Sequence, residues 1–197
     1  MLLYKLRDNR FSLVMRTLMH CVVCWLLGAT ALYADDATER RIQISLPVFP
    51  RIVAVDNDFK KKLLPKDHVL LVFVYESSQA QAQRYAESLK QKLTNVAGLQ
   101  FTAKAISVHD QLGGKAPVPT ALFAAERFSE QTFTLVVEYS IKQQRILFSP
   151  FVGDVERGAA AGIAITSRIK PFFNIKTLER AEIDINAVLM NLSKRHE

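Results

Sequence analysis

Apolar positions in the middle of the chain switch between strand-like and helix-like spacing. Residues 69–75 are apolar throughout and rich in β-branched and aromatic side chains, which is typical of a strand covered on both faces. Apolar residues then recur at three- and four-residue spacing over 82–93, which predicts an amphipathic helix with Ser77 and Ser78 as capping candidates. Residues 99–108 alternate and predict a second strand. Strand, helix and strand together predict a βαβ unit with a right-handed crossover.

The rest of the chain repeats this theme in shorter pieces. The expected elements are a strand over 120–125, a helix after Ser129, a strand over 145–148, a turn-rich connector over 150–158, antiparallel strands over 160–166 and 168–175, and two short helices, of which the second buries Ile183, Ile185, Val188, Leu189 and Leu192. This order predicts an α/β fold, a small three-layer α/β domain with a mixed sheet that combines the βαβ unit with antiparallel C-terminal strands.

Prolines set the expected start of the first helix. Proline has no amide hydrogen to donate within a helix, so Pro47 and Pro50 are expected to interrupt any helix that spans them. Apolar residues at near-helical spacing follow Pro50. The pattern therefore predicts a short helix past Pro50 that ends at Pro65.

The first 34 residues have the features of a signal peptide. Four cations against one acid precede an apolar run over 18–32, and small residues follow, with cleavage expected after Ala31 or Ala34. An uncleaved anchor is the alternative, but a spanning helix needs about 20 apolar residues and this run is shorter. We therefore expect a signal peptide over 1–34 and a single domain over 35–197, located in the periplasm.

Cysteine use and charge narrow the classes of protein. Both cysteines, Cys21 and Cys24, lie in the predicted signal peptide, so the mature chain is expected to fold without disulfides or a thiol metal site. Removing four cations and one acid with residues 1–34 lowers the formal net charge from +7 to +4. That balance, with Lys60–Lys62 as the longest basic run and no interleaved aromatic residues, predicts a solvated surface and no nucleic-acid partner.

Motifs for catalysis are weak throughout. The turn after the first strand has no glycine for a nucleotide phosphate, no Walker or G-x-S-x-G sequence occurs, and His68, His109 and His196 are too far apart for a metal motif. His109 and Asp110 follow a strand and are the one pair that suggests a general acid or base, although adjacent loop residues are more often solvated. We expect no enzyme, no metal and no cofactor.

The connector over 150–158 is the candidate binding loop. Two glycines, one of them Gly158, bracket Asp154, Glu156 and Arg157. Arg157 is suited to an anionic group or a partner protein, with the two acids orienting it, and a solvent-facing turn is the plainer interpretation.

The C-terminal third resembles the YfiR-like proteins. The resemblance covers residues 155–165, which contain Gly158, the strand residues 168–175, which contain Asn174, and the helical residues that follow. Asn174 is the most distinctive position, and its chemistry suits a structural role that holds the turn after a strand. Unlike known family members, the mature chain has no cysteines, and only Gly158 stands where a glycine pair is usual, so redox control is not carried over.

The resemblance implies regulation by binding. YfiR-like proteins hold the periplasmic sensor domain of an inner-membrane diguanylate cyclase inactive, and their release raises cyclic di-GMP and promotes biofilm formation. The implied partner is such a domain, with contact to the membrane only through that partner and a homodimer left open. A periplasmic small-ligand, or solute, binding protein is the alternative function.

Overall fold

The computed structural model describes residues 36–93 and 99–197. The chain divides into two compact units, Met1–Arg40 and Arg41–Glu197. Of the first unit, residues 36–40 are described, and they are helical. The predicted signal peptide and its cleavage sites at Ala31 and Ala34 lie outside the described residues. Within the described residues, no helix is both long and apolar enough to cross a membrane.

A seven-stranded mixed sheet forms the centre of the second unit, with the strand order β2-β1-β3-β4-β5-β6-β7. The strands are β1 (His68–Tyr75), β2 (Gln100–Ser107), β3 (Ala121–Ala124), β4 (Ile146–Phe148), β5 (Ala161–Ile165), β6 (Ile169–Asn174) and β7 (Lys194–His196). The first five are parallel, β6 runs antiparallel to β5, and β7 is parallel to β6. The predicted βαβ unit and the antiparallel C-terminal pair are confirmed.

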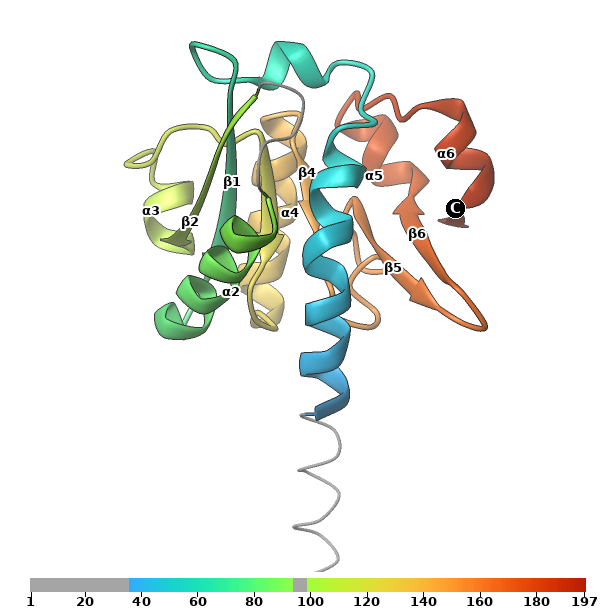
Figure 1. Cartoon of the computed structure of the whole chain (residues 1–197), viewed down its shortest axis with the longest axis horizontal. Coiled ribbons are helices and arrows are strands. Elements are labelled where there is room, and N and C mark those ends of the chain that lie inside the picture. Colours follow the sequence, from blue (N-terminus) through green and yellow to red (C-terminus); the bar gives the residue numbers. More distant parts are fainter. Residues whose placement is uncertain (1–35, 94–98) are drawn as a thin grey trace, which may run out of the picture. The chain divides into compact units, whose positions relative to one another are not determined.

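Helices cover both faces of this sheet. They are the helix over 41–53, the 3-10 helix η1 (Phe59–Lys62), and the α-helices α2 (Gln79–Lys92), α3 (Val108–Leu112), α4 (Glu130–Lys142), α5 (Ile175–Arg180) and α6 (Ala187–Leu192). Figure 1 shows helix 41–53 and α2 in front of the sheet and α4 behind it. Both α3 and α5 contact α4, so the domain has three layers. The predicted three-layer α/β fold is therefore confirmed.

Four phenylalanines join helix 41–53 to the sheet. Phe49 of the helix packs against Phe73, Phe123 and Phe148 of β1, β3 and β4, with ring centroids 5.4 to 6.2 Å apart. All four rings are fully buried. Burial of a phenylalanine contributes about 1.5–3 kcal/mol, so this cluster is a main source of stability for a core without cysteines.

The predicted helix break at the prolines is wrong. Residues 41–53 are continuously helical through Pro47 and Pro50, and the carbonyl of Pro50 still accepts a bond of 3.0 Å from the amide of Ala54. An interior proline costs a helix about 3 kcal/mol. Burial of Leu46, Phe49 and neighbouring apolar residues on one face offsets that cost, while Pro47 lies on the exposed face.

The expectation for the last helix is also wrong in part. Ile183 and Ile185 are buried, but they precede α6, and Val188 and Leu192 on α6 are 70% and 63% exposed. The helix starts late because Asn186 caps it by accepting a bond of 3.0 Å from the amide of Val188.

Long-range backbone hydrogen bonds hold the segment before α6 in an extended form. The amide of Asn57 donates to the carbonyl of Asp184 at 2.8 Å, and the amide of Asn186 donates to the carbonyl of Val55 at 2.9 Å.

Strand β7 and helix α3 were not predicted, because both are too short to show a period in the sequence.

Candidate functional site

The carboxyl ends of β1 and β3 form the place where α/β sheets usually bind ligands. From β1 the chain crosses to β2 on one side, and from β3 it crosses to β4 on the other, so the topology reverses between β1 and β3. A crevice is expected outside the strands at such a point. Glu76 follows β1 directly, and Glu126 lies two residues past the end of β3.

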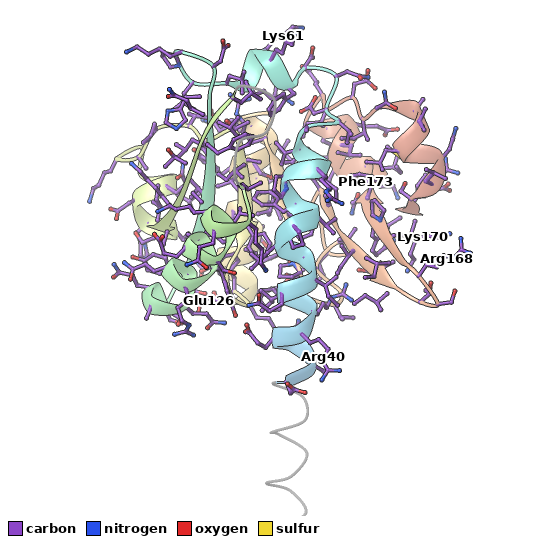
Figure 2. The ribbon with its side chains drawn as sticks, in the orientation of Figure 1. Arg40, Lys61, Glu126, Arg168, Lys170 and Phe173 are labelled. Carbon is purple, nitrogen blue, oxygen red and sulfur yellow. The ribbon has the colours of Figure 1, made fainter. Side chains whose placement is uncertain are left out.

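Glu126 occupies the start of α2. Its carboxylate accepts bonds from the amides of Glu76, Ser77 and Ser78, the last at 3.1 Å, and from the Ser77 hydroxyl at 2.7 Å. Figure 2 shows Glu126 at this end of the domain, beside the first turn of α2. Ser78 is the N-cap residue by position, but its side chain makes no capping bond, so the prediction named the right place and the wrong group.

Glu76 binds the turn that leads into α4, whose N-terminal cap is Ser129. Its carboxylate accepts from the amide of Ser129 at 3.0 Å and from the hydroxyls of Ser129 and Thr132 at 3.0 and 2.6 Å. The acid after β1 therefore binds the start of α4, and the acid after β3 binds the start of α2. Helix N-termini attract anionic groups, and here the chain's own carboxylates bind the turns that lead into both helices.

The two glutamates remain charged at neutral pH. The bond from the Thr132 hydroxyl, with those from Ser129, holds the pKa of Glu76 below its ordinary value. Burial raises the pKa of Glu126, but the bonds from Ser77 and the adjacent amides outweigh it, so that pKa is also lowered. Two carboxylates at this edge disfavour a further anion there.

His109 and Asp110 lie in the first turn of α3. Asp110 accepts a bond of 2.8 Å from the Ser107 hydroxyl, its amide donates to the same oxygen at 3.1 Å, and Lys115 lies 3.7 Å from its carboxylate. Asp110 is thus bound to Ser107, the N-cap of α3, while His109 lies at the surface.

The predicted binding loop pairs the buried Asp154 with the exposed Arg157. Asp154 is buried and accepts from the Ser149 hydroxyl at 2.6 Å and from Arg157 Nη1 at 3.2 Å. Burial raises the pKa of Asp154, and these bonds oppose the rise. Arg157 Nη2 also donates to Glu130 at 2.5 Å, and its guanidinium lies 4.3 Å from the centre of the Phe133 ring. Both residues are therefore engaged in contacts within the domain.

Glu156 lies apart from that pair. It is exposed and lines a shallow depression of about 210 Å³ together with Arg41 and Val152. Arg41 donates to the carbonyls of Pro150 and Ile163, which anchors this surface to helix 41–53. Partner binding through Asp154, Glu156 and Arg157 stays a prediction.

Gly158 and Asn174 meet where the connector packs on α5. The Asn174 side chain accepts from the amide of Thr177 at 2.9 Å, which caps α5, and donates to the carbonyl of Val155 at 2.7 Å. Gly158 has φ +127°, and a Cβ there would lie 3.3 Å from a methyl of Val137. The residues that carry the resemblance thus form one packed unit.

An apolar hollow lies at the opposite end of the sheet. A cavity of about 550 Å³ opens between helix 41–53 and α2, where β1 and β2 begin. Its lining is apolar apart from two cations and consists of Pro47, Pro50, Arg51, Val53, Ala54, Phe59, Val69, Leu71, Leu89, Lys92, Leu93, Leu99 and Phe101. This size and character fit the usual range of about 300–1,000 Å³ for ligand sites.

Sequence reasoning missed this cavity because it missed one of its walls. The wall is helix 41–53, whereas the prolines were expected to interrupt any helix there and the first helix to begin past Pro50. The spacing of Ile42, Leu46, Phe49 and Val53, at intervals of four, three and four residues, was the available signal.

The sequence matches no family model and no curated protein. Solved structures do match. A substrate-binding protein with adhesive properties from Clostridium difficile, in its ligand-free open form, is 14% identical, with a TM-score of 0.51 over 71% of this chain and 58% of that one. This likeness shows the α/β fold.

Two further structures match less closely. An ABC domain in complex with L-Trp from Streptococcus pneumoniae is 15% identical, with a TM-score of 0.45 over 73% of this chain and 61% of that one. A conserved domain protein from Vibrio cholerae is 14% identical, with a TM-score of 0.47 over 70% of this chain and 57% of that one. The chain therefore matches about three fifths of the length of each of these structures.

The described residues offer binding groups more than reactive ones. Across 36–93 and 99–197, no group of three or more histidine, cysteine or acidic side chains is placed to hold a metal ion. The acids at the strand ends are engaged as helix caps, while the cavity presents apolar side chains. This arrangement suits reversible binding of an apolar group.

Proposed function

We propose that this chain is a non-catalytic binding protein, acting in the periplasm, that takes a small apolar ligand in the cavity between helix 41–53 and α2. The single observation that carries the proposal is the cavity itself, about 550 Å³ with eleven apolar side chains among its thirteen lining residues. Such a site binds by removing apolar surface from water and needs no reactive group.

The arrangement of the sheet supports the same function. At the switch point the carboxylates of Glu76 and Glu126 are engaged in hydrogen bonds, whereas the apolar cavity of about 550 Å³ is open to a guest. The likeness to the Clostridium difficile substrate-binding protein agrees with a domain that binds without reacting. Substrate-binding proteins usually close two lobes on a ligand, whereas this domain would enclose its ligand between two helices of one unit.

The test uses protein purified from expressing cells without detergent. A ligand present at one hundred times its Kd should raise the free energy of unfolding by about 2.7 kcal/mol. Apolar compounds are screened for that stabilisation, first by thermal shift and then by calorimetry. We expect at least one compound to bind with one-to-one stoichiometry.

A pair of matched variants locates the site. Ala54→Phe puts a ring into the cavity lining and should abolish binding, whereas Ala80→Phe, on an exposed position of α2, should leave it intact. If no compound stabilises the protein, or if Ala54→Phe binds as well as the unaltered chain, the proposal is wrong.

Regulation of a membrane protein is the second candidate function. The observation that favours it is the projecting β5–β6 hairpin, on which Ile165 and Ile169 face each other and are 45% and 50% exposed, next to the exposed Arg168. Exposed apolar pairs of this kind often mark protein interfaces. The resemblance to YfiR-like proteins suggests the partner, the periplasmic sensor domain of an inner-membrane diguanylate cyclase.

Co-purification tests the regulatory role. The chain should retain the sensor domain of a co-expressed cyclase, and Ile165→Asp with Ile169→Asp should release it. Deletion should raise cyclic di-GMP and surface attachment. Unchanged cyclic di-GMP after deletion would rule the role out.

A further inference from the structure

We propose that the ligand of the cavity is an amphipathic anion, with its carboxylate or equivalent head on Arg51 and Lys92 and its apolar body among the remaining lining residues. This inference rests on the proposed function and names the chemical class of the ligand. It concerns the same cavity between helix 41–53 and α2.

The lining supplies one kind of polar contact. Of the thirteen lining residues within the described part of the chain, eleven are aliphatic, aromatic or proline, and none is acidic. The two that remain, Arg51 and Lys92, are both cations and lie on exposed parts of the two helices that wall the cavity. A ligand with an apolar body therefore gains most from a single negative charge at the exposed edge.

Both cations are available to a ligand. In the described part of the chain neither forms an ion pair, and the nearest polar contact of Lys92 is a long one, 3.5 Å from Nζ to the Gln43 amide oxygen. The neighbouring Lys90 is engaged with Glu87 at 2.6 Å. Arg51 and Lys92 thus differ from Arg180, which forms an ion pair of 2.8 Å with Glu138 on the surface.

The apolar residues from the sheet indicate where the apolar part of the ligand would lie. Val69 and Leu71 of β1 and Phe101 of β2 form the floor, and both β1 residues are buried in the core. A flexible alkyl chain or a single aromatic ring can cover this floor while its head stays near the helix surface. Medium-chain fatty acids and arylalkanoic acids share that chemistry.

Calorimetry with matched amphiphiles tests the inference. Decanoate, decanol and decyltrimethylammonium carry the same chain with a negative, neutral or positive head. We expect decanoate to bind about tenfold more tightly than decanol, since two exposed ion pairs each contribute up to about fivefold. Affinity should rise about fourfold with each methylene from octanoate to decanoate and fall with added salt for the anion alone.

Paired charge variants assign the preference to the two residues. Arg51→Gln with Lys92→Gln should bring decanoate and decanol to equal affinity. Arg168→Gln with Lys170→Gln removes the same charge from the β5–β6 hairpin, where Figure 2 shows both side chains at the far side of the domain, and should keep the tenfold preference.

The outcomes separate the inference from the proposed function. Equal affinity for decanoate and decanol in the unaltered chain, or tighter binding of the cation, overturns the inference and leaves an apolar site. Failure of all three amphiphiles and of every screened compound overturns the proposed function as well. Loss of the preference in the hairpin variant would show that overall charge, and not Arg51 and Lys92, attracts the anion.

Discussion

The two ends of the parallel strands differ in how their charged side chains are paired. At the carboxyl end, the carboxylates of Glu126 and Glu76 accept hydrogen bonds from the turns that lead into α2 and α4. At the amino end, the two helices leave an apolar cavity, and Arg51 and Lys92 beside it have no acidic partner among the described residues. One end is occupied by hydrogen bonds within the chain, and the other is where we propose that a ligand binds.

This difference shows that a fold does not fix the place of its site. The switch point between β1 and β3 is where an α/β sheet is expected to bind. Here hydrogen bonds to Glu76 and Glu126 tie the β1–α2 and β3–α4 turns together. The cavity between helix 41–53 and α2 lies away from this point, at the amino end of the strands.

The largest effect is expected from the core that connects the two ends. Phe123 lies at the centre of the aromatic cluster, with ring centroids 4.8 Å from Phe73 and 5.4 Å from both Phe49 and Phe148. Phe123→Ala should lower the free energy of unfolding by about 3–5 kcal/mol through lost burial and a residual cavity, as measured by urea denaturation. A loss below about 1 kcal/mol would contradict the packing described for this cluster.

A smaller loss of stability, without a loss of ligand binding, is expected from a change at the carboxyl end alone. Glu126→Ala removes the acceptor for three amides at the start of α2, and it should cost about 1–2 kcal/mol of unfolding free energy while leaving ligand binding in the cavity unchanged. The matched variant Glu130→Ala, at an exposed acid on α4, should cost less than about 1 kcal/mol. If Glu126→Ala abolishes ligand binding in a folded protein, the two ends are not independent.

The smallest effect is the dependence of stability on pH. The pKa values of Glu76 and Glu126 are lowered in the folded protein, so their contribution is complete above about pH 4.5 and is lost as the pH falls through their folded values. Asp154, whose pKa is raised by burial, contributes with the opposite sign. The unaltered chain should therefore lose stability below about pH 4.5 by denaturant titration, and Glu76→Gln with Glu126→Gln should flatten that decline. An equally steep decline in the double variant would contradict the capping roles.

Much of the fold follows from local pattern. The all-apolar run at residues 69–75 can only be a strand covered on both faces, and the stripe from Ala82 to Leu89 can only face that sheet. Helix 41–53 could not be predicted in this way, because the cost of Pro47 and Pro50 is local, whereas the packing of Phe49 that offsets it is tertiary.

The candidate site depends even more on tertiary structure. The hydrogen bonds to Glu76 and Glu126 join residues about fifty positions apart, and nothing near Glu126 in the sequence shows that it will bind the amide of Ser78. Arg157 was predicted to be a binding residue because its partner Glu130 lies 27 positions away, and this contact cannot be seen in the sequence. The cavity arises from the distance between two helices, which no sequence period encodes.

The most direct test of the account is a titration of the methyl-labelled protein with decanoate, followed by NMR. Binding at the amino end predicts chemical-shift changes at the methyls of Val69, Leu71 and Leu89, with Ala80 and Ala124 at the carboxyl end unchanged. Changes confined to Ala80 and Ala124, or no saturable change at the cavity methyls, would contradict the claim that this domain binds its ligand between helix 41–53 and α2.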